Sequence, residues 1–390
     1  MTRQAAITPV AGLVLALLAG CATQPRTDPP AISPALLIAG QPLTGGVEPP
    51  PLPDADILGL DADMRRFIAE RVASTGKSRW RLRDLLRALL DDAGFVIEYQ
   101  ERTYTAAEAF RLRRANCLAF TNLFVALARE AGLTVHYQEV DIPPDWSVNG
   151  AALMLSRHIN TLVDTDEQGE LVVDFNIADF RSSYERRVIS DARARAHYYS
   201  NVGVERMGAG EPVLALQNFR KALAAEPAFV PAWINLAALY QRAGHGEWAE
   251  AAWRQALTLD PREYVAMSNL ERRYRSTGRL AQADELQGRI RWHRRQNPYY
   301  RFQLAEAAFA AADYDGAMGH LRFAISRKPN EDRFYALMGF AYLRRGDASS
   351  AQRWLARAGE VAGDALLKER YHGKLELLRR SQELWSPAGS

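Results

Sequence analysis

Cys117 stands near the start of an apolar run at residues 116–129, NCLAFTNLFVALAR. Apolar residues recur there at helical spacing, so the run predicts a helix with the cysteine in its first turn. The N-terminus of a helix presents unpaired N–H groups and a partial positive charge. Both favour the thiolate, which is the nucleophilic form of cysteine. The same N–H groups can bind the oxyanion of a tetrahedral intermediate, so the pattern predicts acyl transfer chemistry.

A nucleophilic cysteine needs a general base, and the base needs an orienting group. His158 lies in the stretch SRHINTLVDTD and Asp174 in GELVVDFN, and both stretches predict strands. The residues DEQG between them predict a hairpin turn, which makes the two strands neighbours. Side chains on paired strands can meet, so we predict a catalytic triad of Cys117, His158 and Asp174.

Several residues compete for these roles. The competing candidates are His136 for the base, and Asp164, Asp166 and Asp179 for the acid. Gln100 and Tyr104 are candidates for a side-chain oxyanion donor, and Arg113 and Arg114 could add positive potential near the thiol. A lone cysteine is also common as an inert core residue, so an inactive site is the alternative. No metal or cofactor is expected, because the histidines are scattered without zinc-like spacing.

The elements that must position these residues predict an α+β domain over residues 56–190. Helical spacing recurs in DADMRRFIAERV and in SRWRLRDLLRALLDDAGF. Thr105 and Glu108 form a capping-box pattern at the start of another helix. Gly132 is a natural stop for the helix that carries Cys117. The stretches FVIEYQ and LTVHYQEVDI predict two more strands, and helices followed by an antiparallel sheet make an α+β domain.

Taken together, these fragments resemble the bacterial transglutaminase-like superfamily, which has a papain-type fold. The resemblance covers residues 95–185 and rests on the order and spacing of NC, LFVALAREAGL, RHIN and VVDFN. It implies that Cys117 is the nucleophile, His158 the general base and acid, and Asp174 the orienting residue. The compact domain looks most like bacterial cysteine proteases. The family often has glycine before the cysteine, where this chain has Asn116.

From residue 194 onward the pattern is helical only, and it repeats. Pro227 and Pro261 lie 34 residues apart, and the stretches before them align. The matched pairs are Gly210 with Gly244, Ala215 with Ala249, Phe219 with Trp253 and Ala222 with Ala256. This period resembles the tetratricopeptide repeat, and about five repeats span residues 194–363, followed by a closing helix. We therefore predict an all-α solenoid over residues 191–390, whose concave surface suits peptides or partner proteins.

The N-terminus indicates export. An apolar run from about Val10 to Ala19 follows Arg3, which predicts a signal peptide at residues 1–20. It ends in Leu-Ala-Gly before Cys21, which resembles the bacterial lipobox and implies lipidation of Cys21. Ala22 follows the cysteine, which resembles an outer-membrane rather than an inner-membrane destination. The proline-rich residues 21–55 predict a semi-extended tether.

Composition is that of an ordinary globular protein. Apolar residues make up 48% of the chain and charged residues 24%, and the formal net charge of +3 is too small to indicate nucleic-acid binding. The basic run RIRWHRR at residues 289–295 is interpreted as a solvated helix face, with a partner-binding patch as the alternative.

The whole sequence therefore predicts an outer-membrane lipoprotein facing the periplasm that acts as a cysteine protease or amidase on a protein or peptide. Its chemistry is expected within residues 56–190, and its repeats are expected to recruit the substrate or a partner protein. Two alternatives remain: a catalytically inactive scaffold that binds partners through its repeats, and a true protein-cross-linking transglutaminase.

Overall fold

The computed structural model describes residues 32–73, 75–91, 95–142, 158–166, 169–175, 183–363 and 365–385. The expected signal peptide, Cys21 and Asp179 lie outside these residues. The described residues from Ile32 onward belong to one compact unit. Within them, every helix is too short or too polar to cross a bilayer.

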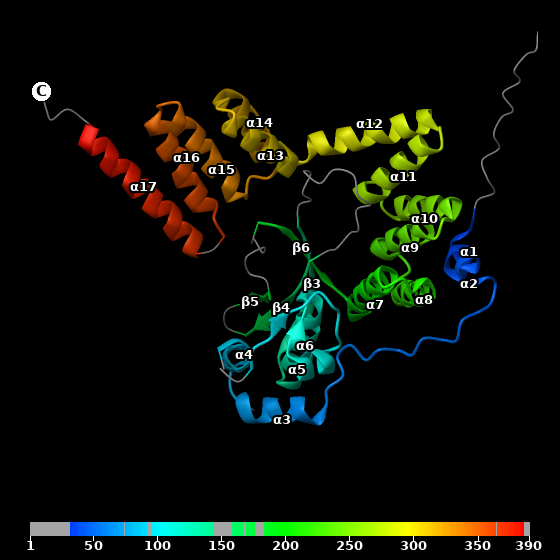
Figure 1. Ribbon diagram of the computed structural model, residues 1–390. Coiled ribbons are helices and arrows are strands. Elements are labelled where there is room, and N and C mark those ends of the chain that lie inside the picture. The colour runs from blue at the N-terminus through cyan, green and yellow to red at the C-terminus, as the bar shows by residue number, and fades with distance from the viewer. Residues whose placement is uncertain are drawn as a thin grey trace, which may run out of the picture. The chain divides into compact units, whose positions relative to one another are not determined.

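Helices precede an antiparallel sheet in the first half of the chain (Figure 1). The helical elements are α3 (Ala62–Arg71), α4 (Ser78–Leu86), the π-helix η1 (Arg87–Asp91), α5 (Ala106–Leu112) and α6 (Cys117–Glu130). The sheet has the order β5-β4-β3-β6, with strands β3 (Thr134–Asp141), β4 (His158–Thr165), β5 (Gly169–Val173) and β6 (Glu185–Ile189). The short strands β1 (Glu98–Tyr99) and β2 (Arg114–Ala115) form a separate parallel pair. This region of the structure thus contains both helices and an antiparallel sheet.

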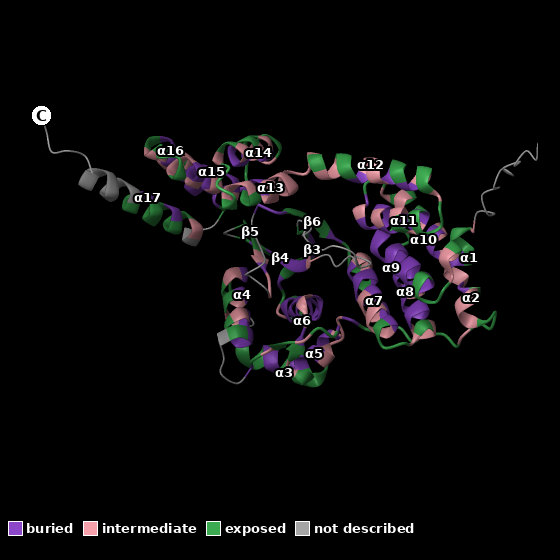
Figure 2. Ribbon diagram, turned by 45° about the horizontal axis from the view of Figure 1, so that its top comes forward, coloured by how far each residue is buried: buried purple, intermediate pink, exposed green. Residues whose placement is uncertain are grey.

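Helix α6 lies at the centre of this region. Every residue from Leu118 to Ala128 is buried, as the purple ribbon of α6 shows (Figure 2). The helix contacts β3 and β4 as well as α3, α4 and α5, so it is covered on several sides. A helix that is apolar all round belongs in a core, which explains the long apolar run after Cys117.

Two local sequence patterns are confirmed by the structure. Thr105 and Glu108 make both hydrogen bonds of a capping box at the start of α5. Gly132 has φ +73°, a left-handed conformation that glycine adopts without steric cost, directly after α6. These two devices set where the helices around the cysteine begin and end.

Strand β6 was missed by the sequence patterns. Its residues Glu185 to Val188 are exposed and only Ile189 is buried, so the stretch has no apolar alternation. It pairs with β3 as an edge strand, with Glu139 opposite Arg187. The pairing depends on residues almost fifty positions away, which a local pattern does not reveal.

The expected tether differs in the structure from residue 32 onward. Helices α1 (Pro34–Ala39) and α2 (Gln41–Thr44) form there and contact α10 and α8 of the repeats. Leu37 is fully buried, and its carbonyl oxygen accepts a hydrogen bond of 2.6 Å from the Tyr240 hydroxyl. Arg220 Nε donates to the Ile38 carbonyl at 2.7 Å. The apolar anchor and these donors dock the segment onto the repeats, so residues 32–55 are not a free spacer.

The repeat half consists of helix pairs, as the 34-residue period predicted. The pairs are α7 (Asp191–Gly208) with α8 (Pro212–Ala225), α9 (Val230–Arg242) with α10 (Gly246–Leu259), α11 (Tyr264–Ser276) with α12 (Leu280–Gln296), α13 (Pro298–Ala310) with α14 (Tyr314–Arg327), and α15 (Asp332–Arg344) with α16 (Ala348–Val361). Helix α17 (Ala365–Trp385) follows them as the closing helix. Small residues such as Ala215, Ala249 and Ala317 are fully buried, which lets paired helices approach closely.

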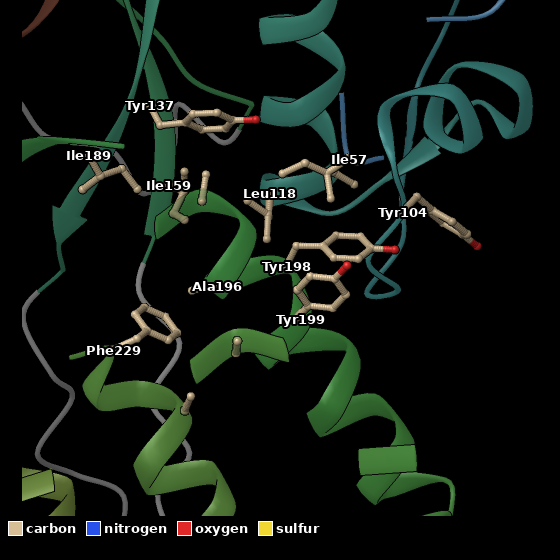
Figure 3. Packing of buried hydrophobic residues seen from close by; sticks show 14 of the residues in the cluster. Ile57, Tyr104, Leu118, Tyr137, Ile159, Ile189, Ala196, Tyr198, Tyr199 and Phe229 are labelled. Atoms are coloured by element: carbon tan, nitrogen blue, oxygen red, sulfur yellow. The ribbon is translucent and has the colours of Figure 1, made fainter. Parts of the chain in front are cut away.

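The first repeat shares its core with the α+β region. Tyr198 and Tyr199 of α7 belong to the same apolar cluster as Leu118 of α6 and Ile57, and Figure 3 shows Tyr198 near Leu118 with Tyr199 beside Tyr198. Helix α7 begins immediately after Ser190, whose side chain caps it. The boundary predicted at residue 190 therefore separates two parts of the chain that share one apolar cluster.

A buried carboxylate reinforces this junction. The side chain of Glu139 on β3 is 3% exposed and accepts from Arg193 Nε at 2.6 Å, while His197 Nε2 lies 2.5 Å from it. Arg187 on β6 pairs with the same carboxylate. Burial by itself raises the pKa of Glu139, but the hydrogen bonds from His197 and Arg193 outweigh it and lower that pKa well below its usual range. One anion thus joins β3, β6 and α7.

Candidate functional site

The structure brings His158 and Asp174 into contact. His158 is the first residue of β4, and Asp174 follows the last residue of β5. His158 Nε2 lies 2.6 Å from Asp174 Oδ2, and the two side chains are 8% and 3% exposed. The sequence predicts a hairpin between these two strands, and residues 167–168 of its turn lie outside the described residues. The strands on either side are paired in register, with Thr165 opposite Gly169. The two side chains therefore meet across neighbouring strands.

A third side chain completes this contact. Asn160 Nδ2 donates a hydrogen bond of 3.0 Å to the same Asp174 oxygen that faces His158. Asn160 is fully buried, so the amide is held in place by its surroundings. Sequence reasoning missed this residue. The available signal was its position two residues after His158, because alternate residues of a strand share a face.

Cys117 is the second side chain that influences the His158 imidazole. Because Nε2 faces Asp174, Nδ1 is the ring nitrogen left for the thiol. Burial by itself lowers the pKa of His158, but the hydrogen bonds and charges of Asp174 and Cys117 outweigh it and raise the pKa to about 9. At neutral pH the imidazole is therefore protonated beside the Asp174 carboxylate.

Cys117 opens α6, and Asn116 is the N-cap residue. The Asn116 side-chain oxygen accepts from the Ala119 N–H at 2.8 Å, while its Nδ2 donates to the Glu101 carbonyl at 3.1 Å and to Thr103 Oγ1 at 2.9 Å. Asn116 has φ −86°, a conformation open to any residue. Glycine is therefore not required before the cysteine, and the asparagine fastens the loop at residues 101–103 to the helix start.

Thr121 ties the cysteine turn to the strand of the histidine. Its hydroxyl lies 2.8 Å from the Cys117 carbonyl oxygen and 3.2 Å from the Ile159 carbonyl oxygen. Thr121 is 2% exposed. This contact fixes the start of α6 beside the start of β4, which is where the thiol and the imidazole must meet.

An aromatic stack includes Phe120, which lies three residues after the cysteine on α6. Tyr99 is 62% exposed, and its ring stacks on Phe175, which stacks in turn on the buried Phe120. Burial of part of the Tyr99 side chain raises its pKa, and the charge of Cys117 adds to the shift. The stack joins residues of β1 and α6 to the residue after Asp174.

The competing candidates lie elsewhere. His136 and Asp164 are exposed, and Asp166 accepts a hydrogen bond of 3.1 Å from Ser78 Oγ. Arg113 stacks on the ring of Phe95 at 3.3 Å from its centroid, and burial lowers the pKa of Arg113. Arg114 lies 3.6 Å from the carboxylate of Glu98. The structure thus assigns both arginines to packing and surface pairing.

The two candidate oxyanion donors contact each other. The Tyr104 hydroxyl donates to Gln100 Oε1 at 2.9 Å, and the Gln100 backbone N–H donates to the Ala115 carbonyl at 3.0 Å. Gln100 is therefore held beside the residues that lead into Cys117. A search of the described residues for three or more histidine, cysteine, aspartate or glutamate side chains that could hold a metal ion found none.

The raised pKa of His158 makes a stability prediction. A histidine whose pKa rises on folding from 6.5 to about 9 stabilises the fold fully below pH 6.5, and the stabilisation is lost as pH rises through about 9. The unmodified protein should have a larger free energy of unfolding than His158→Ala at pH 6. This difference should decrease as the pH is raised to 9.5. We expect a fall of about 2 kcal/mol, allowing for partial solvent screening. Urea titrations at the two pH values measure it, and an unchanged difference would contradict the geometry at His158.

Comparisons with known proteins concern the repeats. A search of curated proteins found no match. Solved structures that resemble the chain include "Crystal structure of MamA protein" (21% identity, 43% of this chain and 91% of that chain, TM-score 0.24). Another is "MamA 41-end from Desulfovibrio magneticus RS-1" (16% identity, 44% and 96%, TM-score 0.25). A third is YrrB, titled "a TPR protein with an unusual peptide-binding site" (18% identity, 46% and 91%, TM-score 0.24). Residues 308–374 match the tetratricopeptide repeat family model, so this part of the chain is a tetratricopeptide-repeat region.

Proposed function

We propose that the protein is an acyl-transfer enzyme that works through a thioester at Cys117. The observation that carries the proposal is the contact of His158 with Asp174, together with a cysteine in the first turn of a helix that acts on the same imidazole. A nucleophile, a base that reaches it and a third group that orients the base together define this class of site. The proposal includes a transglutaminase-like, papain-type identity for residues 56–190.

Each group has a role in the proposed reaction. The Cys117 thiolate attacks the substrate carbonyl, and the resulting oxyanion accepts hydrogen bonds from the Cys117 N–H and from Gln100 Nε2. The Gln100 oxygen is engaged by Tyr104, which orients the amide nitrogen as the donor. His158 then gives its proton to the leaving amine, and a thioester forms. Water or an amine, deprotonated by His158, attacks the thioester carbonyl, which releases the acyl group and regenerates the Cys117 thiolate beside a protonated His158.

The test is direct detection of the thioester. The protein is incubated with short peptides that carry a fluorogenic amide, and the intact mass and the peptide map are recorded together with fluorescence. We expect an acyl adduct on Cys117 and release of the fluorophore, with both lost in Cys117→Ser. Added primary amines that divert the acyl group would assign cross-linking rather than hydrolysis. If the protein is folded and the Cys117 thiol is accessible but no acyl adduct forms, the proposal that the protein is an acyl-transfer enzyme would be contradicted.

The repeats favour a protein partner as a second part of the function. Tetratricopeptide repeats form surfaces for protein–protein interaction, and the match at residues 308–374 supports this role. We propose that the repeats recruit the substrate or a partner protein. The alternative is a scaffold without catalysis. In that case partner capture would survive Cys117→Ser and no thioester would form in any variant.

We further propose that Cys21 carries lipid and holds the protein at the outer membrane, facing the periplasm. The support is the Leu-Ala-Gly-Cys sequence after an apolar run. Each buried methylene of an acyl chain contributes about 0.8 kcal/mol, so several chains on one cysteine anchor stably. Cys21→Ser is expected to move the protein from the membrane fraction to the soluble fraction of the cell envelope. Retention of Cys21→Ser in the membrane fraction would show that another contact anchors the chain.

A further inference from the structure

A groove of about 430 Å³ lies between the helical segment formed by α4 and η1 and the strand β5. Leu82, Leu86 and Leu90 follow one another at a spacing of four residues along its helical wall, and Leu171 lines it from β5. Leu90 is 56% exposed and Leu171 is 37% exposed. Leucines at i, i+4 and i+8 share one face of a helical segment, so the groove has a continuous apolar wall.

The rim of the groove is basic. Arg79 and Arg83 each lie 4.4 Å from the centroid of the Trp80 ring, and Arg87 lines the groove one turn further along. Asp84 pairs with Arg83 at 3.0 Å but does not itself line the groove. Three guanidinium groups around an apolar slot give the site a clear charge preference, because guanidinium pairs with carboxylates in a bidentate manner.

The strand that forms the other wall is at the edge of the sheet. In the described sheet, β5 pairs with β4 on one side, and the order β5-β4-β3-β6 places it last. An edge strand offers backbone N–H and C=O groups to a further strand, while side-chain pockets beside it supply specificity. Leu171 of this strand lines the groove, so a side chain of an added strand can reach the pocket beside it.

We propose that this groove docks an extended segment of another protein, in which a large apolar side chain is flanked by carboxylates. The segment adds to the edge of β5, its apolar side chain enters the slot between Leu86, Leu90 and Leu171, and its carboxylates pair with Arg83 and Arg87. This site goes beyond the acyl-transfer chemistry, since its binding does not require Cys117. A membrane surface fits less well, because an apolar slot recessed below charged groups receives a side chain better than it enters a bilayer.

The test uses the full chain carrying Cys117→Ser, so that a bound peptide is not consumed. The probe is a fluorescein-labelled octapeptide with a central leucine between glutamates, and binding is followed by fluorescence anisotropy. Leu90→Glu and Arg87→Glu are each expected to weaken binding at least tenfold. The matched controls are Leu280→Glu, an exposed leucine on α12, and Arg66→Glu, an exposed arginine on α3, and both should bind as the parent does.

Three peptide variants sharpen the result. Each change should weaken binding at least tenfold. Lysines in place of the glutamates remove the negative charge, and serine in place of the leucine removes the apolar side chain. Methylation of alternate backbone nitrogens removes the hydrogen bonds to the strand. Equal affinity for the glutamate and lysine peptides, or for Leu90→Glu and its control, would overturn the proposal. A second outcome would also overturn it: the protein sediments with phosphatidylglycerol vesicles, Leu90→Glu does not, and no variant binds the peptide. That outcome would assign the groove to a membrane contact. Circular dichroism establishes whether each variant is folded. If Leu90→Glu is not folded, Arg87→Glu is used in its place to test the groove.

Discussion

Cys117 is expected to react with iodoacetamide at pH 6 about 100-fold faster in the unmodified protein than in a His158→Ala variant, the order of effect of one positioned acid–base group. The reason is the electrostatic coupling between the imidazole and the sulfur. With a pKa of about 9, His158 is an imidazolium at pH 6 and attracts the thiolate. Rates are measured by mass spectrometry of the peptide that contains Cys117, from pH 5 to pH 10.

Two variants serve as comparisons in the same experiment. Asp174→Asn keeps the shape of the side chain but removes the charge that holds His158 protonated, so its rate should fall between those of the other two proteins. His136→Ala removes an exposed histidine of the preceding strand and should react as the unmodified protein does. If Cys117 reacted equally in all four proteins, or only after denaturation, it would be an inert cysteine and the proposed enzyme would have to be abandoned.

A chain cut after Ser190 is expected not to fold. The cut removes α7, and with it Tyr198 and Tyr199 from the core shared with Leu118. Burying one such side chain contributes about 1.5–3 kcal/mol, and leaving a buried carboxylate such as Glu139 without its partners costs about 3–5 kcal/mol. Glu139 loses Arg193 and His197 in this cut but keeps Arg187, and even so these losses approach the lower end of the 5–15 kcal/mol that is typical of the whole free energy of unfolding of a domain. Circular dichroism and the urea midpoint measure the outcome.

A longer fragment is the control for this truncation. Ending the chain at Asp260 keeps α7 to α10, including the contacts of Glu139 with Arg193 and His197. This fragment should fold and should still alkylate at Cys117, because the side chains of the site all precede residue 176. A fragment ending at Ser190 that is folded and labels normally would show that α7 is dispensable. The shared core would then contribute far less than its burial indicates.

The devices that the sequence by itself determined are local or periodic. The capping box of Thr105 and Glu108 depends on two side chains and their own backbone, and the 34-residue spacing of Pro227 and Pro261 reflects repeats that contact only their neighbours. The position of Cys117 in a first helical turn follows from the helical period and from the cap at Asn116. The contact of His158 with Asp174 followed from a hairpin, since a turn of known length fixes which strand residues are neighbours.

Only the tertiary structure decided the contacts between segments far apart in the chain. Strand β6 has four exposed residues in succession and pairs with β3 because Glu139 and Ile189 find partners there. The sequence around Leu37 looks like a proline-rich spacer. It nevertheless packs on the repeats, because Arg220 and Tyr240 donate hydrogen bonds to its backbone carbonyl oxygens. Burial and hydrogen bonding of this kind depend on which surface the rest of the fold brings near, and neither composition nor periodicity records that. The sequence therefore determined the helix starts, the repeats and the candidate nucleophile. The tertiary structure decided how the first repeat packs against the region that carries Cys117.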